Sequence, residues 1–274
     1  MIQDHQPANF SIQPFSRPPQ PGDYAVCWRG NEVALVAASP VPRLPRIGEL
    51  APLSPEGLFQ FSGGALYQGE APAALPNGLT LYPIGIFREM ATADAPDAYL
   101  LLTAYHLRRW QLTHRFCGAC GQPMQPDTAE RALRCTACGH IVYPVLSPAV
   151  SVAIRNGDKL LLLKNKQGNY HHFTLLSGYV EAGETLEHAV EREVMEEVGL
   201  RVRDIRYVGS QPWGLSQIVM ISFTAELDGP DKLTLQESEI ADARWLRADE
   251  LEPRVYRAGL TAELIERFRL GKLF

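Results

Sequence analysis

The sequence has no apolar run long enough to cross a membrane as a helix, and its net charge is −5 rather than strongly positive. The first absence predicts that no segment spans a membrane. The second excludes the overall basic field that draws proteins to nucleic acid without sequence preference. The opening residues, MIQDHQPANF, have neither a basic start nor an apolar core. We therefore expect no signal peptide and a cytoplasmic protein.

What is present is typical of a globular protein with room for two domains: 274 residues, 46% apolar and 21% charged. The first hundred residues are rich in proline and glycine. Short apolar runs among them predict the strands of a small α+β domain, at Tyr24–Trp28, Val33–Ala37 and Leu79–Phe87. We find no catalytic constellation in this region. A helix predicted over Tyr99–Thr113 has Leu100, Ala104, Leu107 and Trp110 on one apolar face.

Four of the five cysteines form two C-x2-C pairs separated by fourteen residues, namely Cys117, Cys120, Cys135 and Cys138. This spacing is close to that of a zinc ribbon, in which four thiolates hold one Zn²⁺. The alternative, two disulfides, is disfavoured for an intracellular chain. His106 and His114 are further candidate ligands, but four thiolates already complete a site, so we expect packed or solvated histidines. We expect Cys27 to be a small buried apolar residue.

The second half of the chain alternates strand and helix patterns. Ser147–Arg155 and Lys159–Lys164 predict two strands joined by a tight turn. Thr185 predicts an N-cap, the following helix extends to about Val198, and Gly199 supplies its C-terminal stop. Later segments predict two more strands and a closing helix, at Val202–Val208, Gln217–Leu227 and Ala262–Leu270.

The segment from Gly178 to Leu200 concentrates acidic residues on one helix face. Glu193, Glu196 and Glu197 stand at i, i+3 and i+4, within an arc of roughly 100°. Carboxylates that close repel one another unless a cation compensates them. Oxygen ligands on a rigid helix suit Mg²⁺ or Mn²⁺, which complete their coordination with water and phosphate. The alternative is an acidic solvated helix after a glycine turn.

The same segment, GYVEAGETLEHAVEREVMEEVGL, resembles the Nudix box at every defining position. The resemblance implies metal-dependent hydrolysis of a nucleoside diphosphate linked to another group. It also implies an α/β fold, a Nudix α/β/α sandwich with a mixed sheet over residues 146–274. A zinc ribbon over 113–145 and a small α+β domain over 1–112 precede it.

The Nudix resemblance also implies roles for individual residues. Glu193 and Glu197 are expected to hold divalent cations, Glu196 to serve as a ligand or proton acceptor, and Arg192 and Glu184 to brace the loop and the helix. The backbone carbonyl of Ser177 and the carboxylate of Glu239 match further metal ligands of the family. The zinc is expected to be structural, because four thiolates leave no open position.

The ribbon and the segment Ser210-Gln211-Pro212-Trp213 resemble the NADH pyrophosphatases, a Nudix subgroup. Members split NADH into reduced nicotinamide mononucleotide and AMP, and some remove NAD caps from RNA. This resemblance implies a homodimer that acts on NADH or NAD, with NAD-capped RNA as a further candidate substrate. The absence of a long apolar run predicts that it has no membrane partner. It implies substrate contacts at Glu130, Tyr143, Tyr179, Gln211, Pro212, Trp213, Gly214, Leu215, Ser216, Gln217 and Ile218. For each aromatic residue alone, core packing is the alternative.

One segment departs from the subgroup. Its members continue the motif with Pro-Phe-Pro, whereas this chain has Gly214-Leu215-Ser216. The ring and both prolines are absent, so we expect weaker selectivity for NADH. Two other hypotheses are hydrolysis of another dinucleotide, such as ADP-ribose or FAD, and a zinc-ribbon protein that senses nucleotides without cleaving them. The complete set of glutamates argues against the second.

Overall fold

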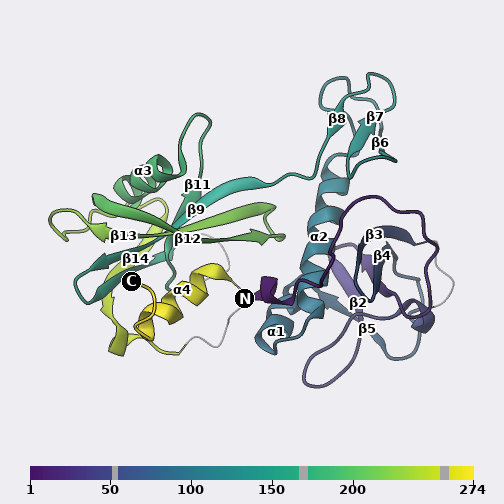
Figure 1. Ribbon diagram of the computed structural model, residues 1–274, viewed down its shortest axis with the longest axis horizontal. Helices are drawn as coiled ribbons and strands as arrows, with labels where there is room; N and C mark the ends of the chain where they lie inside the picture. Colours follow the sequence, from purple (N-terminus) through teal and green to yellow (C-terminus); the bar gives the residue numbers. More distant parts are fainter. Residues whose placement is uncertain (51–54, 167–171, 254–258) are drawn as a thin grey trace. The chain divides into compact units, whose positions relative to one another are not determined.

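The computed structural model describes residues 1–50, 55–166, 172–253 and 259–274 (Figure 1). The chain divides into two compact units. One comprises Met1, Leu146–Trp213 and Ile218–Phe274, and the other comprises Ile2–Val145 and Gly214–Gln217. None of the helices in the described ranges has both the length and the apolarity that a membrane crossing requires.

The unit that contains the N-terminal residues is built on a five-stranded sheet of order β3-β4-β1-β2-β5. Its strands are β1 (Tyr24–Arg29), β2 (Glu32–Val36), β3 (Glu56–Phe61), β4 (Gly64–Glu70) and β5 (Leu79–Pro83). Strands β1 and β2 confirm two predicted strands. The third prediction, Leu79–Phe87, is wrong in its second half, because the strand ends at Pro83. The chain then forms a short 3₁₀ turn, Ile84–Ile86, and helix α1, Phe87–Thr92.

Helix α2 (Asp97–Thr113) follows and is buried on most of its circumference. The predicted apolar face is buried as expected, with Leu100, Ala104, Leu107 and Trp110 at most 4% exposed. Leu101 and Tyr105, on other faces, are buried as well. A helix that is apolar almost all round is a core helix, and α2 is therefore central to this unit.

The ribbon follows α2 as a three-stranded antiparallel sheet of order β6-β7-β8. The strands are short: β6 (Met124–Pro126), β7 (Leu133–Cys135) and β8 (Ile141–Val142). So small a sheet buries few apolar side chains, and its stability depends on another source.

The other unit contains a six-stranded mixed sheet. Its central strand β9 (Ser147–Asn156) pairs parallel with β13 (Ile218–Leu227) and antiparallel with β10 (Lys159–Asn165) and β11 (Leu176–Tyr179). Strands β12 (Val202–Trp213) and β14 (Ile240–Arg247) lie at the two ends of the sheet order. Strand β14 was not predicted from the sequence. The predicted turn between the first two strands is confirmed.

One helix packs on each face of this sheet (Figure 1). Val150, Val152 and Ile154 of β9 join one core cluster with helix α3 (Leu186–Val198). The intervening Ala153 joins the other cluster with helix α4 (Leu260–Arg269). Alternate residues of one strand thus serve two cores, as a strand buried on both sides requires. The result is the expected α/β/α sandwich.

Candidate active site

Helix α3 begins and ends where the sequence predicts. Thr185 is the N-cap, and its hydroxyl accepts a hydrogen bond of 3.2 Å from the backbone N–H of His188. Gly199 ends the helix in the left-handed region, at φ +68°. Val190, Val194 and Val198 are fully buried. Their burial fixes the rotation of the helix about its axis, and therefore the place of Glu193 and Glu197.

A cavity of about 420 Å³ lies beside α3. It brings together the four predicted ligands of the catalytic metal, Ser177, Glu193, Glu197 and Glu239. Two predicted substrate contacts, Tyr179 and Ile218, also line it. Four further residues line the cavity and were not predicted as ligands or substrate contacts, namely Ala149, Gly178, Glu181 and Met220. Glu181 could have been suspected, because it lies within the acidic loop between Gly178 and helix α3.

Gly178 allows the strand that precedes this helix to approach it closely. A Cβ atom at Gly178 would overlap the carboxylate of Glu193. Any other residue would displace the carboxylate or the backbone of β11. The glycine is therefore required by the packing of Glu193 against the backbone.

Arg192 holds the loop and the helix together through five hydrogen bonds. Its guanidinium donates to both carboxylate oxygens of Glu184, at 2.6 and 3.0 Å, and to the backbone oxygen of Tyr179 at 2.9 Å. It also donates to Glu193 at 2.8 Å and to Glu196 at 3.0 Å. The Arg192 guanidinium lowers the pKa of Glu184 to about 2. This network has the bracing geometry that the sequence implied.

The side chain of Glu196 differs from those of Glu193 and Glu197 in its exposure and in its contacts. Its side chain is 53% exposed, pairs with Arg192 and does not line the cavity. Glu193 and Glu197 are the better-placed pair, because both line the cavity. A ligand role for Glu196 stays a prediction.

Glu197 is the most perturbed acid of the site. It is 6% exposed, and its Oε2 is buried without a hydrogen-bond partner among the residues that the structure describes. Burial raises its pKa from an ordinary value of 4.5 to about 8, and the charges of Glu193, Glu239 and Glu196 add to the rise. Burial also raises the pKa of Glu193. An unpartnered carboxylate oxygen in an acidic cavity fits a divalent cation, which supplies the missing charge and the missing ligand contact.

The pKa of Glu197 predicts how stability depends on pH before the catalytic metal is added. Between about pH 5 and pH 8 the folded chain keeps a proton on Glu197 that the unfolded chain releases, so stability falls as pH rises through this range. We expect the Tm to fall more steeply in the wild type than in Glu197→Gln, which has no proton to lose. Thermal unfolding after dialysis against magnesium-free buffer, without a chelator that would strip zinc, measures this. Equal slopes for the two proteins would contradict the assignment.

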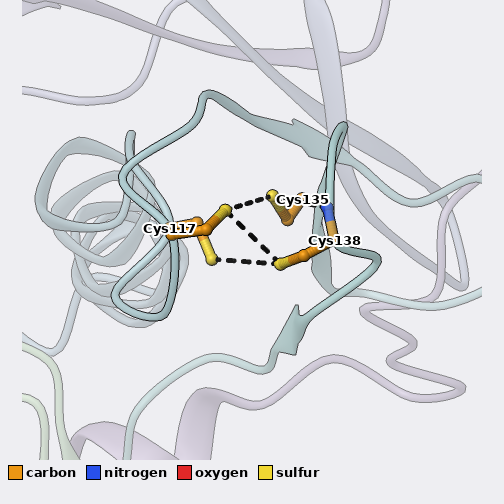
Figure 2. Close-up of side chains that lie close together, drawn as sticks. Cys117, Cys135 and Cys138 are labelled. Atoms are coloured by element: carbon orange, nitrogen blue, oxygen red, sulfur yellow. Dashed lines mark hydrogen bonds between the residues drawn. The ribbon is translucent and has the colours of Figure 1, made fainter.

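The four predicted zinc ligands meet at one point of the ribbon, and Figure 2 labels three of them, Cys117, Cys135 and Cys138. The Sγ atoms of Cys117 and Cys138 are 3.7 Å apart, and that of Cys120 is 3.4 Å from Cys135 and 3.5 Å from Cys138. Backbone N–H groups of Cys138 and Ala137 lower the pKa of the Cys135 thiol to about 6. Four such sulfurs fit a closed tetrahedral zinc site, which has a structural role.

Among the residues that the structure describes, these cysteines form the one group of three or more such ligand atoms within 4.8 Å of one another. The carboxylates of the α3 cavity are spaced more widely. The two histidines considered as extra ligands have other contacts. His106 is buried and donates from Nε2 to the backbone oxygen of Val145 at 2.7 Å, and Nδ1 of His114 contacts the backbone oxygen of Trp110 at 2.9 Å. Cys27 is buried, as expected.

Other predicted substrate contacts belong to the ribbon. The hydroxyl of Tyr143 donates to the carboxylate of Glu130 at 2.6 Å, and both residues are exposed. They belong to the unit of residues 2–145, whereas the α3 cavity belongs to the other unit. In the motif after the box, Gln211 is 2% exposed and its Oε1 accepts a hydrogen bond of 2.6 Å from the backbone N–H of Leu260. Trp213 is half-buried and Pro212 is exposed.

The segment Gly214–Gln217 connects β12 to β13. A Cβ atom at Gly214 would overlap the backbone oxygen of Leu102 on α2, and both residues belong to the same unit. Gln217 adopts a left-handed conformation, with φ +57°, which turns the chain into β13. Position 214 is therefore closed to proline, or to any side chain, unless α2 moves.

The fold and the two sites define a class of enzyme. It is a metal-dependent hydrolase in which one helix supplies carboxylates to a cavity on a mixed sheet, with a separate structural zinc ribbon.

Comparison with known proteins agrees with this class. Residues 145–268 match the NUDIX domain family, and residues 112–143 match the NADH pyrophosphatase zinc ribbon domain. An NAD-capped RNA hydrolase NudC from Stutzerimonas stutzeri is 39% identical over 230 residues, which is 82% of each chain. One from Haemophilus influenzae is 41% identical over 169 residues, 61% of this chain and 64% of that protein. The chain therefore belongs to the Nudix hydrolase family, in the branch that carries the NADH pyrophosphatase zinc ribbon.

Proposed function

We propose that this enzyme hydrolyses the pyrophosphate bond of NADH and NAD, releasing nicotinamide mononucleotide and AMP, and that it also removes NAD caps from RNA 5′ ends. The observation that carries this proposal is the α3 cavity, which is lined by Ser177, Glu193, Glu197 and Glu239 and where a buried oxygen of Glu197 has no hydrogen-bond partner in the described part of the chain. The relatives named NAD-capped RNA hydrolase support the choice of substrate. Mg²⁺ or Mn²⁺ is the proposed catalytic ion, because the donors are oxygen atoms.

The residues of the cavity have different proposed roles in binding the metal and the substrate. Glu193, Glu197, Glu239 and the backbone carbonyl of Ser177 would hold the divalent cation. When bound, such an ion polarises the pyrophosphate and acidifies a bound water. Arg192 keeps Glu193 in place and links it to the end of β11 at Tyr179.

Tyr179 is the proposed stacking partner of a substrate ring. Its side chain lines the cavity and is 57% exposed, so one face of the ring is available to a base or to nicotinamide. We propose that Glu130, Tyr143 and the segment Gln211–Ile218 contribute to substrate binding as the subgroup resemblance implies. For Gln211 this role acts through the backbone that its buried side chain anchors.

The altered loop predicts weak discrimination between substrates. We expect the ratio of kcat/KM for NADH to that for ADP-ribose to be low, because no ring or proline stiffens residues 214–216. Leu215→Phe should raise that ratio about threefold to tenfold, since it restores the ring without touching Gly214. A proline at position 214 would instead meet the backbone of Leu102 and lower stability. Steady-state kinetics with both substrates measures the ratio.

A wild type already strongly selective for NADH, and unchanged by Leu215→Phe, would contradict this reading of the loop. Ser216→Ala is the matched control, since it alters the neighbouring position without adding a ring. A panel of NADH, NAD, ADP-ribose, FAD and NAD-capped RNA, with Mg²⁺ or Mn²⁺, tests the proposed function itself. Absence of turnover with NADH, NAD and NAD-capped RNA would overturn it, whether or not ADP-ribose or FAD is cleaved.

We further propose that the protein is a cytoplasmic homodimer with three domains, at residues 1–112, 113–145 and 146–274. The subgroup resemblance supports the dimer, and the sequence patterns support the domain boundaries. Sedimentation showing a monomer at micromolar concentration would count against the dimer.

A further inference from the structure

Glu239 reaches the α3 cavity from residues 228–239, which connect β13 to β14 without forming a helix or a strand. Glu239 is exposed, whereas Glu197 is buried on helix α3. Leu233 and Leu235 of this β13–β14 connection pack against the core cluster that contains α3. A metal ligand on an exposed connection needs further contacts to orient its carboxylate.

The β13–β14 connection is hydrogen-bonded to the C-terminal end of α3. The backbone N–H of Thr234 donates to the backbone oxygen of Val198 at 2.9 Å, and that of Gln236 donates to the backbone oxygen of Glu197 at 3.0 Å. Both oxygens belong to the last turn of the helix, where carbonyl groups have no partner within the helix. Gly199 makes room for this approach, because a Cβ atom there would lie 2.9 Å from the Cβ of Thr234. The backbone of Gln236 is therefore joined to that of a predicted metal ligand.

Gln236 is also bonded to Glu239. Its side-chain Nε2 donates to Oε1 of Glu239 at 3.4 Å, and within the described ranges this amide is the one hydrogen-bond donor to that carboxylate. The backbone oxygen of Gln236 accepts from the N–H groups of Glu239, at 3.0 Å, and of Ile240, at 2.9 Å. Gln236 thus contacts two proposed metal ligands, one through its backbone alone and the other through its side chain as well.

The backbone of Glu239 is fixed separately, from β10. The backbone N–H of Lys166 donates to the backbone oxygen of Glu239 at 2.7 Å. The register between β10 and β14 shifts at the same point, between Lys164 and Asn165. A bulge of this kind changes the direction of a neighbouring side chain. The backbone therefore directs Glu239 toward the cavity, and the torsion angles of its side chain are left to the contact with Gln236.

We propose that Gln236 is a positioning residue for the catalytic metal, which fixes the carboxylate of Glu239 relative to the end of helix α3 that carries Glu197. This inference rests on the proposed function, which assigns both carboxylates to a divalent cation. Carboxylates that line one cavity repel one another until an ion is bound. The exposed carboxylate of Glu239 would then turn toward solvent. A neutral amide donor opposes that rotation without adding a positive charge that would compete with the cation.

Binding of Mn²⁺ to the full-length, zinc-loaded protein tests this inference without any substrate. The paramagnetic resonance signal of free Mn²⁺ gives the Kd, and the site counted is the one that Glu197→Gln loses. Gln236→Met keeps the backbone N–H and nearly the same volume but has no side-chain donor. We expect it to raise the Kd about threefold or more. Gln236→Leu serves if Gln236→Met loses its fold, as judged by Tm and zinc content.

Turnover of NADH separates positioning from a merely structural role. The Mn²⁺ concentration that gives half-maximal turnover should rise in Gln236→Met by the same factor as the Kd. The kcat at saturating Mn²⁺ should stay within about twofold of the wild type, because a bound ion itself holds Glu239 in place. A lower kcat or a lower Tm, with an unchanged requirement for Mn²⁺, would overturn the positioning role.

A double variant shows whether the effect passes through Glu239. In a Glu239→Ala background, Gln236→Met should weaken Mn²⁺ binding no further, because the carboxylate that the amide orients is gone. Ser238→Ala is the matched control, since it changes an exposed residue of the same connection that does not line the cavity. A further loss in the double variant, or an equal loss in Ser238→Ala, would overturn the proposal.

The same titrations distinguish this inference from the proposed function. A Kd unchanged in Gln236→Met would overturn the positioning role and leave the proposed function intact. Weaker Mn²⁺ binding in Gln236→Met, together with no cleavage of NADH, NAD or NAD-capped RNA by the wild type, would overturn the proposed function alone. If the wild type binds no Mn²⁺ at a site that depends on Glu197, both are overturned.

Discussion

Glu197→Gln should lower kcat for NADH by on the order of 10³-fold or more while leaving the fold intact. Glu197 lines the α3 cavity with an oxygen that has no partner in the described protein. Glutamine has nearly the same volume but offers a metal one weak neutral oxygen in place of a charged carboxylate. Steady-state kinetics at saturating Mg²⁺ measures the loss. Near neutral pH the folded wild type has to keep a proton on Glu197 that the unfolded chain releases, whereas glutamine carries no such cost, so we expect the Tm of the variant in magnesium-free buffer to equal or exceed that of the wild type.

Glu191→Gln is the matched control for this prediction. Glu191 is an exposed residue of the same helix and does not line the cavity, so its loss should leave kcat within about twofold. Near-normal turnover of Glu197→Gln would show that helix α3 is not part of the active site. An equal loss in both variants would mean that the effect is on the helix rather than on the cavity.

Cys138→Ser should release the zinc and lower the Tm by about 10 °C or more. The ribbon has three short strands and buries little apolar surface, so the metal supplies most of the free energy that keeps it folded. Cys117→Ser should have the same effect. Elemental analysis should find one zinc per wild-type chain and almost none in either variant.

Cys27→Ala provides the control, because Cys27 is a buried thiol outside the cluster and its replacement should leave the zinc content unchanged. A wild type without zinc, or with these four thiols paired as disulfides, would contradict the ribbon assignment. The variants should still cleave substrate to the extent that they remain folded, since the zinc has no open position for chemistry.

Helix α3 could be predicted to within a residue because its signals are local. Thr185 caps it, valines at four-residue spacing mark its buried side, and Gly199 ends it. The zinc ligands could be predicted equally well, since the spacing of two C-x2-C pairs already specifies a closed site. In both cases a few neighbouring residues determine the structure.

Features that depend on distant contacts were missed. Strands β3 and β4 were not predicted from the sequence because both are interrupted by glycines. Strand β14 was not predicted because its partner β10 is far away in the sequence. Met220 and Ala149 line the cavity only because β13 and β9 pair in register, which apolar residues alone do not reveal. The glycine at position 214 could be seen as a departure, but its cause is a contact with Leu102, more than a hundred residues earlier.

The central claim, metal-dependent cleavage of a pyrophosphate bond at the α3 cavity, is tested most directly by identifying products. NADH would be incubated with the wild type and Mg²⁺ or Mn²⁺, and the mixture separated and identified by mass. We predict equal amounts of reduced nicotinamide mononucleotide and AMP, and neither product with Glu197→Gln. Release of free nicotinamide, or equal product from Glu197→Gln, would contradict the account.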